Sequence, residues 1–281
     1  MAGVSLSRQD IDILGKILDP ESSADGVPRL DASLPRDPHI TDAEEYAQVS
    51  QQERDLVLSL QQADMELAGV GKKALLDPIA AYRTALSGLE ELIARYPKYA
   101  SAMNNRAQAL RRLYGDDILL ERTEAPSNSD RTSATAAILQ GDAATRDERE
   151  EAAATVLSDL DRTIALLMPA SSSSSSPNPS PTTLSPTANK TLSQAFTQRG
   201  ALYYATSTHM ASGQRCNSRI ERPEVEWSRE DFEEAAARNF DLGGRFGNDL
   251  ARELAVGINP TAKLCGQMVQ QMMKDEYDPE V

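Results

Sequence analysis

The sequence contains only two cysteines and two histidines in 281 residues. Cys216 and Cys265 do not make a disulfide framework, nor a four-ligand zinc site with His39 and His209, so both are interpreted as ordinary reduced thiols. There is no Gly-rich phosphate loop, paired metal-ligand motif or nucleophile elbow, and two scattered histidines leave little for acid–base chemistry. We therefore predict a protein that is not an enzyme and that has neither a metal nor a cofactor.

Aromatic residues, long apolar runs and positive charge are also scarce. Aromatic side chains make up 5% of the sequence, which argues against a large aromatic-rich β-sandwich core. The formal net charge of −14 repels phosphate backbones and anionic lipid heads, so nucleic acid and membrane surfaces are disfavoured as partners. No apolar run approaches the length of a membrane span, and residues 1–10 lack the basic start and apolar run of a signal peptide. We expect a soluble cytoplasmic protein, with the nucleus as an additional compartment.

Alanine, leucine, glutamate and arginine dominate the sequence, and these residues lose little side-chain freedom in a helix. Apolar residues recur at three- and four-residue spacing, which is typical of amphipathic helices, and no region alternates convincingly as a strand would. The sequence therefore predicts an all-α fold without strands. Helices are expected at 7–18, 42–68, 76–96, 99–114, 149–168, 190–210, 228–241, 247–256 and 260–276.

Polar segments divide these helices into groups. The segment 169–189 contains six consecutive serines followed by prolines, and it cannot bury enough apolar surface to offset its ordering entropy, so a disordered loop is expected there. The predicted organisation is a short N-terminal helix with a polar linker (1–41), a first repeat (42–98), a second repeat (99–168) with an insertion (115–148), the Ser/Pro-rich loop (169–189), a third repeat (190–242) and C-terminal capping helices (243–281).

The division into repeats is based on apolar or small residues that recur in triplets, at offsets of four and then three residues. Tetratricopeptide repeats are helical pairs of about 34 residues with such residues where the two helices touch, and the spacing from Leu92 to Met103 fits that period. The alternative is a non-repeat helical bundle in which the triplets are ordinary core stripes. The triplets are Leu58/Gln62/Met65, Ala85/Leu89/Leu92, Met103/Ala107/Leu110, Val156/Leu160/Thr163, Phe196/Gly200/Tyr203 and Ser228/Phe232/Ala235.

Several short motifs resemble those of the tetratricopeptide repeat protein 36 family. They are Asn104-Asn105-Arg106-Ala107-Gln108-Ala109, Gln198-Arg199-Gly200, Asp231-Phe232-Glu233 with Ala235-Ala236, Ile17-Leu18-Asp19-Pro20, and a C-terminal segment with Asn259-Pro260, Ala262, Leu264-Cys265, Met268 and Met272-Met273. The resemblance covers most of the chain outside the long insertions, which compact members of the family lack. It implies a solenoid of about three tetratricopeptide repeats, with a short N-terminal helix and a C-terminal capping helix.

The same resemblance implies a non-enzymatic adaptor, related to co-chaperones that contact Hsp70 and linked to the regulation of tyrosine breakdown. Tetratricopeptide proteins that hold an acidic C-terminal tail use a clamp of Lys, Asn and Arg side chains from three helices. Here Asn105 takes the central asparagine position, but Ser59, Ala63, Gln194 and Gln198 replace the other four clamp residues. We therefore predict that any Hsp70 contact uses another surface.

Two candidate binding sites follow from these motifs. Polar residues of the second and third repeats form a candidate groove for an extended peptide; alternatively, the two arginines pair with nearby acids and stiffen the solenoid. Methionines near the C-terminus form a candidate apolar docking patch; alternatively, they close the last repeat. The groove residues are Asn105, Arg106, Gln108, Gln194, Gln198 and Arg199, and the patch residues are Met268, Met272 and Met273.

Three functions are compatible with such a chain. The first is a protein-binding, co-chaperone-like adaptor. The second is a regulatory or oligomerisation subunit of a metabolic enzyme complex, without chaperone contact. The third is a purely structural oligomerisation module.

Overall fold

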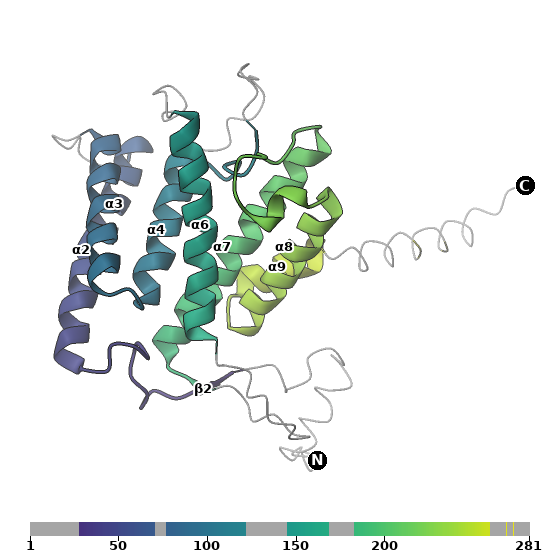
Figure 1. Ribbon diagram of the computed structural model, residues 1–281. Helices are drawn as coiled ribbons and strands as arrows, with labels where there is room; N and C mark the ends of the chain where they lie inside the picture. Colours follow the sequence, from purple (N-terminus) through teal and green to yellow (C-terminus); the bar gives the residue numbers. More distant parts are fainter. Residues whose placement is uncertain are drawn as a thin grey trace, which may run out of the picture.

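The computed structural model describes residues 28–70, 77–121, 145–168 and 183–258, together with Met268 and Met272. The described chain is mostly helical, so the predicted all-α class is confirmed (Figure 1). The predicted helix 7–18, Met273 and most of the predicted helix 260–276 lie outside the described residues. The helices are α2 (Ala43–Leu67), α3 (Pro78–Arg95), α4 (Ala100–Tyr114), α6 (Arg146–Leu167), α7 (Pro186–Ala211), α8 (Arg229–Arg245) and α9 (Asp249–Ile258), with a short 3-10 helix, η2 (Pro223–Glu226).

Side-chain caps explain where several of these helices begin. Helix α6 begins three residues before the predicted start at 149, because Thr145 and Glu148 form a capping box around its first turn. Asp77 caps α3, and Pro78 occupies the first helical position, where a missing N–H is harmless. The predicted start of that helix is therefore accurate to within two residues.

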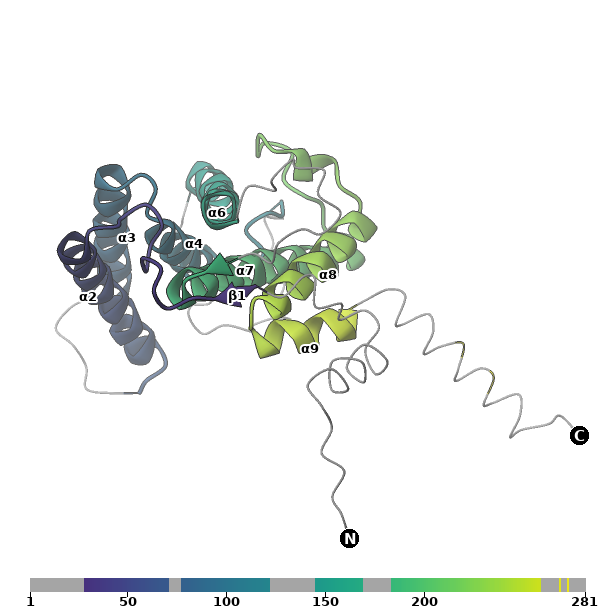
Figure 2. The ribbon, with the colours of Figure 1, turned by 90° about the horizontal axis from the view of Figure 1, so that it is seen from below.

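Each helix packs against the next one along the chain, from α2 through to α9, and α4 also contacts both α2 and α7. The two views agree on this side-by-side arrangement (Figures 1 and 2). At its last turn, α8 carries Gly243 and Gly244, and a Cβ on Gly244 would lie 2.9 Å from the Cα of Arg252. These glycines therefore allow α9 to pack directly against α8. No helix in the described ranges is both long and apolar enough to cross a membrane.

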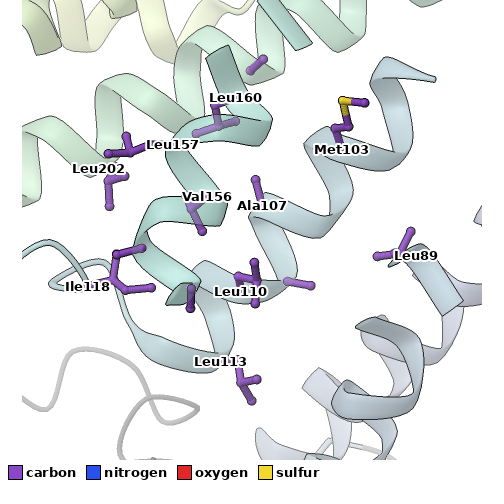
Figure 3. Packing of buried hydrophobic residues seen from close by; sticks show 14 of the residues in the cluster. Leu89, Met103, Ala107, Leu110, Leu113, Ile118, Val156, Leu157, Leu160 and Leu202 are labelled. Carbon is purple, nitrogen blue, oxygen red and sulfur yellow. The ribbon is translucent and has the colours of Figure 1, made fainter. Parts of the chain in front are cut away.

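The central core lies between α4 and α6. Met103, Ala107 and Leu110 of α4 face Val156 and Leu160 of α6, and all five side chains are buried (Figure 3). Buried neighbours from α3, α7 and the 115–121 turn extend the same cluster. The predicted triplets on α3, α4, α6 and α7 are thus core positions.

The α2 triplet is wrong in register, and the α8 triplet is wrong in its first residue only, because Phe232 and Ala235 are buried. On α2, Leu58 and Met65 are 53% and 51% exposed, whereas Leu60 and Ala63 are buried. The run Leu56-Val57-Leu58-Ser59-Leu60 carries leucines on two faces of the helix, so spacing alone did not identify the buried one. On α8, Ser228 is the exposed N-cap rather than a core residue.

The absence of strands was also predicted wrongly. Residues 28–41, here called the strap, run along the lower edge of the helices in Figure 1 and lead into α2. Within the strap, β1 (Arg29–Leu30) pairs in parallel with β2 (Thr183–Leu184), which directly precedes α7. A two-residue pairing between distant segments has no periodic signal in the sequence.

The prediction of a disordered loop at 169–189 is wrong for the last seven residues of that range, which form β2 and the start of α7. Ser185 is buried, accepts a hydrogen bond from the Ala188 backbone N–H at 3.2 Å and donates one to the Arg36 carbonyl at 3.1 Å. Ser185 followed by Pro186 is therefore a helix start, with an N-cap serine and a proline at the first position, inside a Ser/Pro-rich composition.

The predicted insertion 115–148 is also partly ordered. Ile118, Leu119 and Leu120 are buried, and Leu120 forms an antiparallel bridge with Cys216. The Cys216 Sγ lies 3.3 Å from the Leu119 carbonyl, and burial raises the pKa of this thiol to about 11. This turn therefore joins the end of α4 to the loop after α7, with a free, protonated cysteine between them.

Candidate partner-binding face

The face shared by α2 and α4 holds a buried carboxylate, that of Glu53. The Tyr99 hydroxyl donates a hydrogen bond to Glu53, and the Asn105 side-chain amide donates another at 2.8 Å. The ring of Tyr46 packs edge-on against that of Tyr99, with centroids 6.5 Å apart. The side-chain amide of Asn105, one of the predicted groove residues, is therefore hydrogen-bonded within the protein.

Burial raises the pKa of Glu53, and the Tyr99 and Asn105 hydrogen bonds offset only part of that rise. No cation forms an ion pair with Glu53 anywhere in the described ranges. Glu53 already accepts the hydrogen bond that the Asn105 amide would offer to a partner's carboxylate. The predicted absence of an acidic-tail clamp thus gains a physical reason besides the missing cations.

The strap forms one wall of a small pocket beside this carboxylate. The pocket has room for about one water molecule, so it is too small for an organic ligand. Asp37 is buried in this wall and accepts hydrogen bonds from the backbone N–H groups of His39 and Ile40. The lining residues are Arg36, Asp37, Tyr46, Tyr99, Ala100, Ser101, Leu167, Thr187, Ala188 and Thr191.

Arg106, the second predicted groove residue, points between helices. Its guanidinium donates to both oxygens of the Asp159 carboxylate, at 2.7 and 2.8 Å, and so joins α4 to α6. Asp159 is 4% exposed and Arg106 is only partly exposed. Such a bidentate pair has a fixed geometry, so Arg106 holds two helices together.

Arg199 of α7 is held in a similar way. It donates to Asp161 of α6 at 2.6 Å and to Asn239 of α8 at 2.8 Å. Arg222 approaches the other Asp161 oxygen at 2.5 Å and pairs with Glu224, which accepts a hydrogen bond from a buried tyrosine. Both predicted arginines thus pair with acids between helices.

Gln198 also spans two helices. Its amide donates to the Asn104 side chain at 2.9 Å, and its oxygen lies 3.5 Å from the Arg111 guanidinium. By contrast, Gln108 of α4 and Gln194 of α7 are exposed. Within the described ranges, these two are the predicted groove residues whose side chains form no hydrogen bond. They leave amide donors and acceptors available to a partner on two contacting helices.

The predicted methionine patch is described in part. Met268 and Met272 are helical and one turn apart, and their side chains are 58% and 67% exposed. Met273 lies outside the described residues. Two methionines on one side of a helical turn make an adaptable apolar surface.

Glu53, Asp159 and Asp161 are residues that sequence reasoning missed. Glu53 lies at helical spacing with the buried Val49 and Leu60, so an acid on a buried stripe was the available signal. Nothing in the spacing of Asp161 indicates that it pairs with two arginines from different segments. No group of three or more potential metal ligands occurs in the part of the chain that the structure describes.

Comparison with known proteins finds one informative relative. The Aspergillus fumigatus protein named L-tyrosine degradation gene cluster protein hmgX is 29% identical over 280 residues, which span 98% of this chain and 94% of that protein. No known protein family matches the chain. No solved structure matches it either.

Proposed function

We propose that this chain is a non-enzymatic, protein-binding adaptor of tetratricopeptide type that acts in tyrosine metabolism. The observation that carries the metabolic assignment is the similarity to the tyrosine-degradation cluster protein, because it extends over nearly the full length of both chains. An alignment of that extent points to a shared whole-protein role rather than to one shared module.

The tetratricopeptide architecture is supported by the contacts between helices. In such a solenoid the first helices of successive repeats touch one another as well as their own second helices. Here α4 contacts α6, with which it forms a pair, and also contacts α2 and α7. Three of the motifs that resemble the tetratricopeptide repeat protein 36 family lie on α4, α7 and α8. Membership of that family remains part of the proposal.

The binding surface we propose lies across α4 and α7, with Gln108 and Gln194 as its exposed contacts. Arg106, Arg199 and Gln198 hold the helices that carry them, so these helices need little reorganisation when a partner binds. Glutamine amides both donate and accept hydrogen bonds, which suits the backbone of an extended peptide. The C-terminal pair, Met268 and Met272, supplies a second, apolar contact.

The test uses tagged full-length protein expressed in its native organism at the native level. Partners are captured and identified by mass spectrometry, and a strain without the protein is grown with L-tyrosine as the sole carbon source. We expect poor growth of that strain on tyrosine and normal growth on glucose. Normal growth on tyrosine would remove the metabolic part of the proposal.

A matched pair of variants connects the partner to the proposed surface. Gln108→Glu with Gln194→Glu should lose the partner and fail to restore growth, because two carboxylates replace the amide donors. Gln52→Glu with Gln61→Glu makes the same chemical change at two exposed positions of α2 and should behave as wild type. Equal loss in both variants would show that added charge, not the α4–α7 surface, matters.

The second candidate, a regulatory subunit of a metabolic enzyme complex without chaperone contact, is favoured by the relative's place in a degradation gene cluster. The identity of the captured partner distinguishes the adaptor from the regulatory subunit. An Hsp70-type chaperone supports the co-chaperone-like adaptor, and an enzyme of aromatic amino-acid breakdown supports the regulatory subunit.

A further inference from the structure

Exposed arginine, lysine and histidine side chains gather at one end of this acidic protein, where the strap crosses the ends of α4 and α6. They are Arg36 and His39 of the strap, Lys98 in the turn between α3 and α4, and Arg162 of α6. We call these four residues the basic end cluster. None of them forms an ion pair within the part of the chain that the structure describes, although twelve other arginines do.

Specific contacts place the four residues together. The Arg162 guanidinium donates to the Pro97 carbonyl, next to Lys98, at 2.8 Å. The His39 ring lies 3.4 Å from the carbonyl of Leu166, one turn after Arg162. Arg36 lies over the Tyr46 ring at 6.0 Å and shares a pocket wall with Tyr99, the residue after Lys98.

The neighbouring acids do not neutralise this cluster at the surface. Asp37 is buried and accepts backbone hydrogen bonds, and Asp159 is buried and held bidentately by Arg106. Exposed acids lie on the flank, with Asp42 at the N-cap of α2 and Glu44 and Glu45 in its first turn.

Helix geometry does not explain the cluster either. A cation in the last turn of a helix is stabilised by the helix dipole, but the last turn of α6 has no basic residue. The other three members of the cluster, Arg36, His39 and Lys98, lie outside helices. Leu34 and Met168, each 37% exposed, add apolar surface beside them.

We propose that the basic end cluster is a docking surface for an acidic protein segment with interspersed apolar residues. The inference rests on the proposed adaptor function and adds the chemistry of a partner. Three cations without an ion pair, Arg36, Lys98 and Arg162, create a local attraction opposite in sign to the overall field of a chain of net charge −14.

The probe is a short fluorescein-labelled peptide rich in Asp, Glu and Leu, titrated into the full-length protein at low ionic strength. Its control is the same peptide with Asn and Gln in place of the acids. We expect binding of the acidic peptide alone, weakened on raising the salt to about 0.15 M, because exposed charges are then screened.

The variant Arg36→Glu with Lys98→Glu should weaken this binding by about tenfold or more, since two exposed attractions become repulsions. The control, Arg83→Glu with Arg215→Glu, makes the same charge change at exposed cations that form no ion pair in the described ranges, and it should change affinity less than about twofold. Circular dichroism checks the fold of each variant. If the double variant unfolds, Lys98→Ser replaces it.

Absence of acidic-peptide binding at low salt, or equal losses in both variants, would overturn the inference. The proposed function is tested separately, by growth on tyrosine and by the Gln108/Gln194 variant. A partner that still binds the Arg36/Lys98 variant in cell extract would leave the adaptor intact and refute its acidic docking surface.

Discussion

Arg106 and Asp159 show how single polar residues hold neighbouring helices in register. Burial raises the pKa of Asp159 even beside the guanidinium, so the desolvation of this carboxylate is costly. Removing the cation alone should therefore leave an uncompensated buried charge. We expect Arg106→Met to lower the free energy of unfolding by about 3 kcal/mol, measured by urea denaturation.

The double variant Arg106→Met with Asp159→Leu should recover most of that loss, because no charge then remains buried. As a control, Arg238→Met removes a pair with Glu234 in which both side chains are about two-thirds exposed. It should cost less than about 0.5 kcal/mol. An unchanged unfolding midpoint for Arg106→Met would contradict the bridging role.

Glu53 makes stability depend on pH. Its pKa is raised from the ordinary 4.5, chiefly by burial, so the folded state binds the proton more tightly than the unfolded chain. The stabilisation from this proton is fully present below the unfolded pKa and is lost as pH rises through the folded pKa. The Glu53→Gln variant stays neutral, so its stability relative to wild type should increase as the pH rises from about 4.5 through the folded pKa of Glu53.

Urea midpoints of both proteins across that range measure the effect. The exposed Glu44→Gln serves as control, and its curve should run parallel to that of wild type. Parallel curves for Glu53→Gln would mean that the buried carboxylate titrates as it does in the unfolded chain.

At the scale of helices, alanine substitutions at two glycines should change stability in opposite directions. A Cβ on Gly200 of α7 would lie 3.1 Å from the Phe240 ring and 3.2 Å from the Asn239 Cβ, so Gly200→Ala should separate α7 from α8 and cost about 1–3 kcal/mol. Gly257 of α9 has no atom within 4 Å of such a Cβ. Gly257→Ala should therefore stabilise by about 0.5–1 kcal/mol. Thermal unfolding of both variants tests the pair, and a shift in the same direction would refute this packing.

Helix positions could be predicted from the sequence because caps and periodicity are local. Asp77-Pro78 identified the start of α3, and the α4 triplet identified a core face. Periodicity was insufficient on α2, where Leu58 and Leu60 compete for the core, and only packing against α3 and α4 selects Leu60. The pairing of β1 with β2 was inaccessible because neither strand is long enough to show alternation.

The candidate site was predictable to a smaller extent. The sequence identified polar residues on α4 and α7, but it did not separate those that bind other helices from those that face solvent. That difference depends on Asp159, Asp161 and Glu53, whose positions relative to the groove residues are set by tertiary packing. Gln108 and Gln194 are consequently the groove residues still available to a partner.

At the scale of the whole molecule, substitution of the C-terminal methionines should change partner binding without changing the stability of the fold. Met268→Lys with Met272→Lys changes two exposed side chains, so the free energy of unfolding should move by less than about 0.5 kcal/mol. If the methionines dock a partner, affinity should fall about tenfold, because each would contribute on the order of 1 kcal/mol.

The matched control is Leu250→Lys with Val256→Lys, which alters two similarly exposed apolar residues on α9. Capture of the native partner by each variant is compared with that by wild type. Equal capture by both variants would exclude Met268 and Met272 from the interface.

The strap gives the chain a particular order of assembly during synthesis. Ser185 and Arg36, joined by a hydrogen bond, are 149 positions apart, so the strap emerges from the ribosome long before its pairing partner exists. Helices α2, α3, α4 and α6 contact one another, so they can pack together first. The strap must wait until β2 and α7 have been made. The strap therefore docks only after α7 has been made, and it joins the start of α2 to a segment synthesised much later.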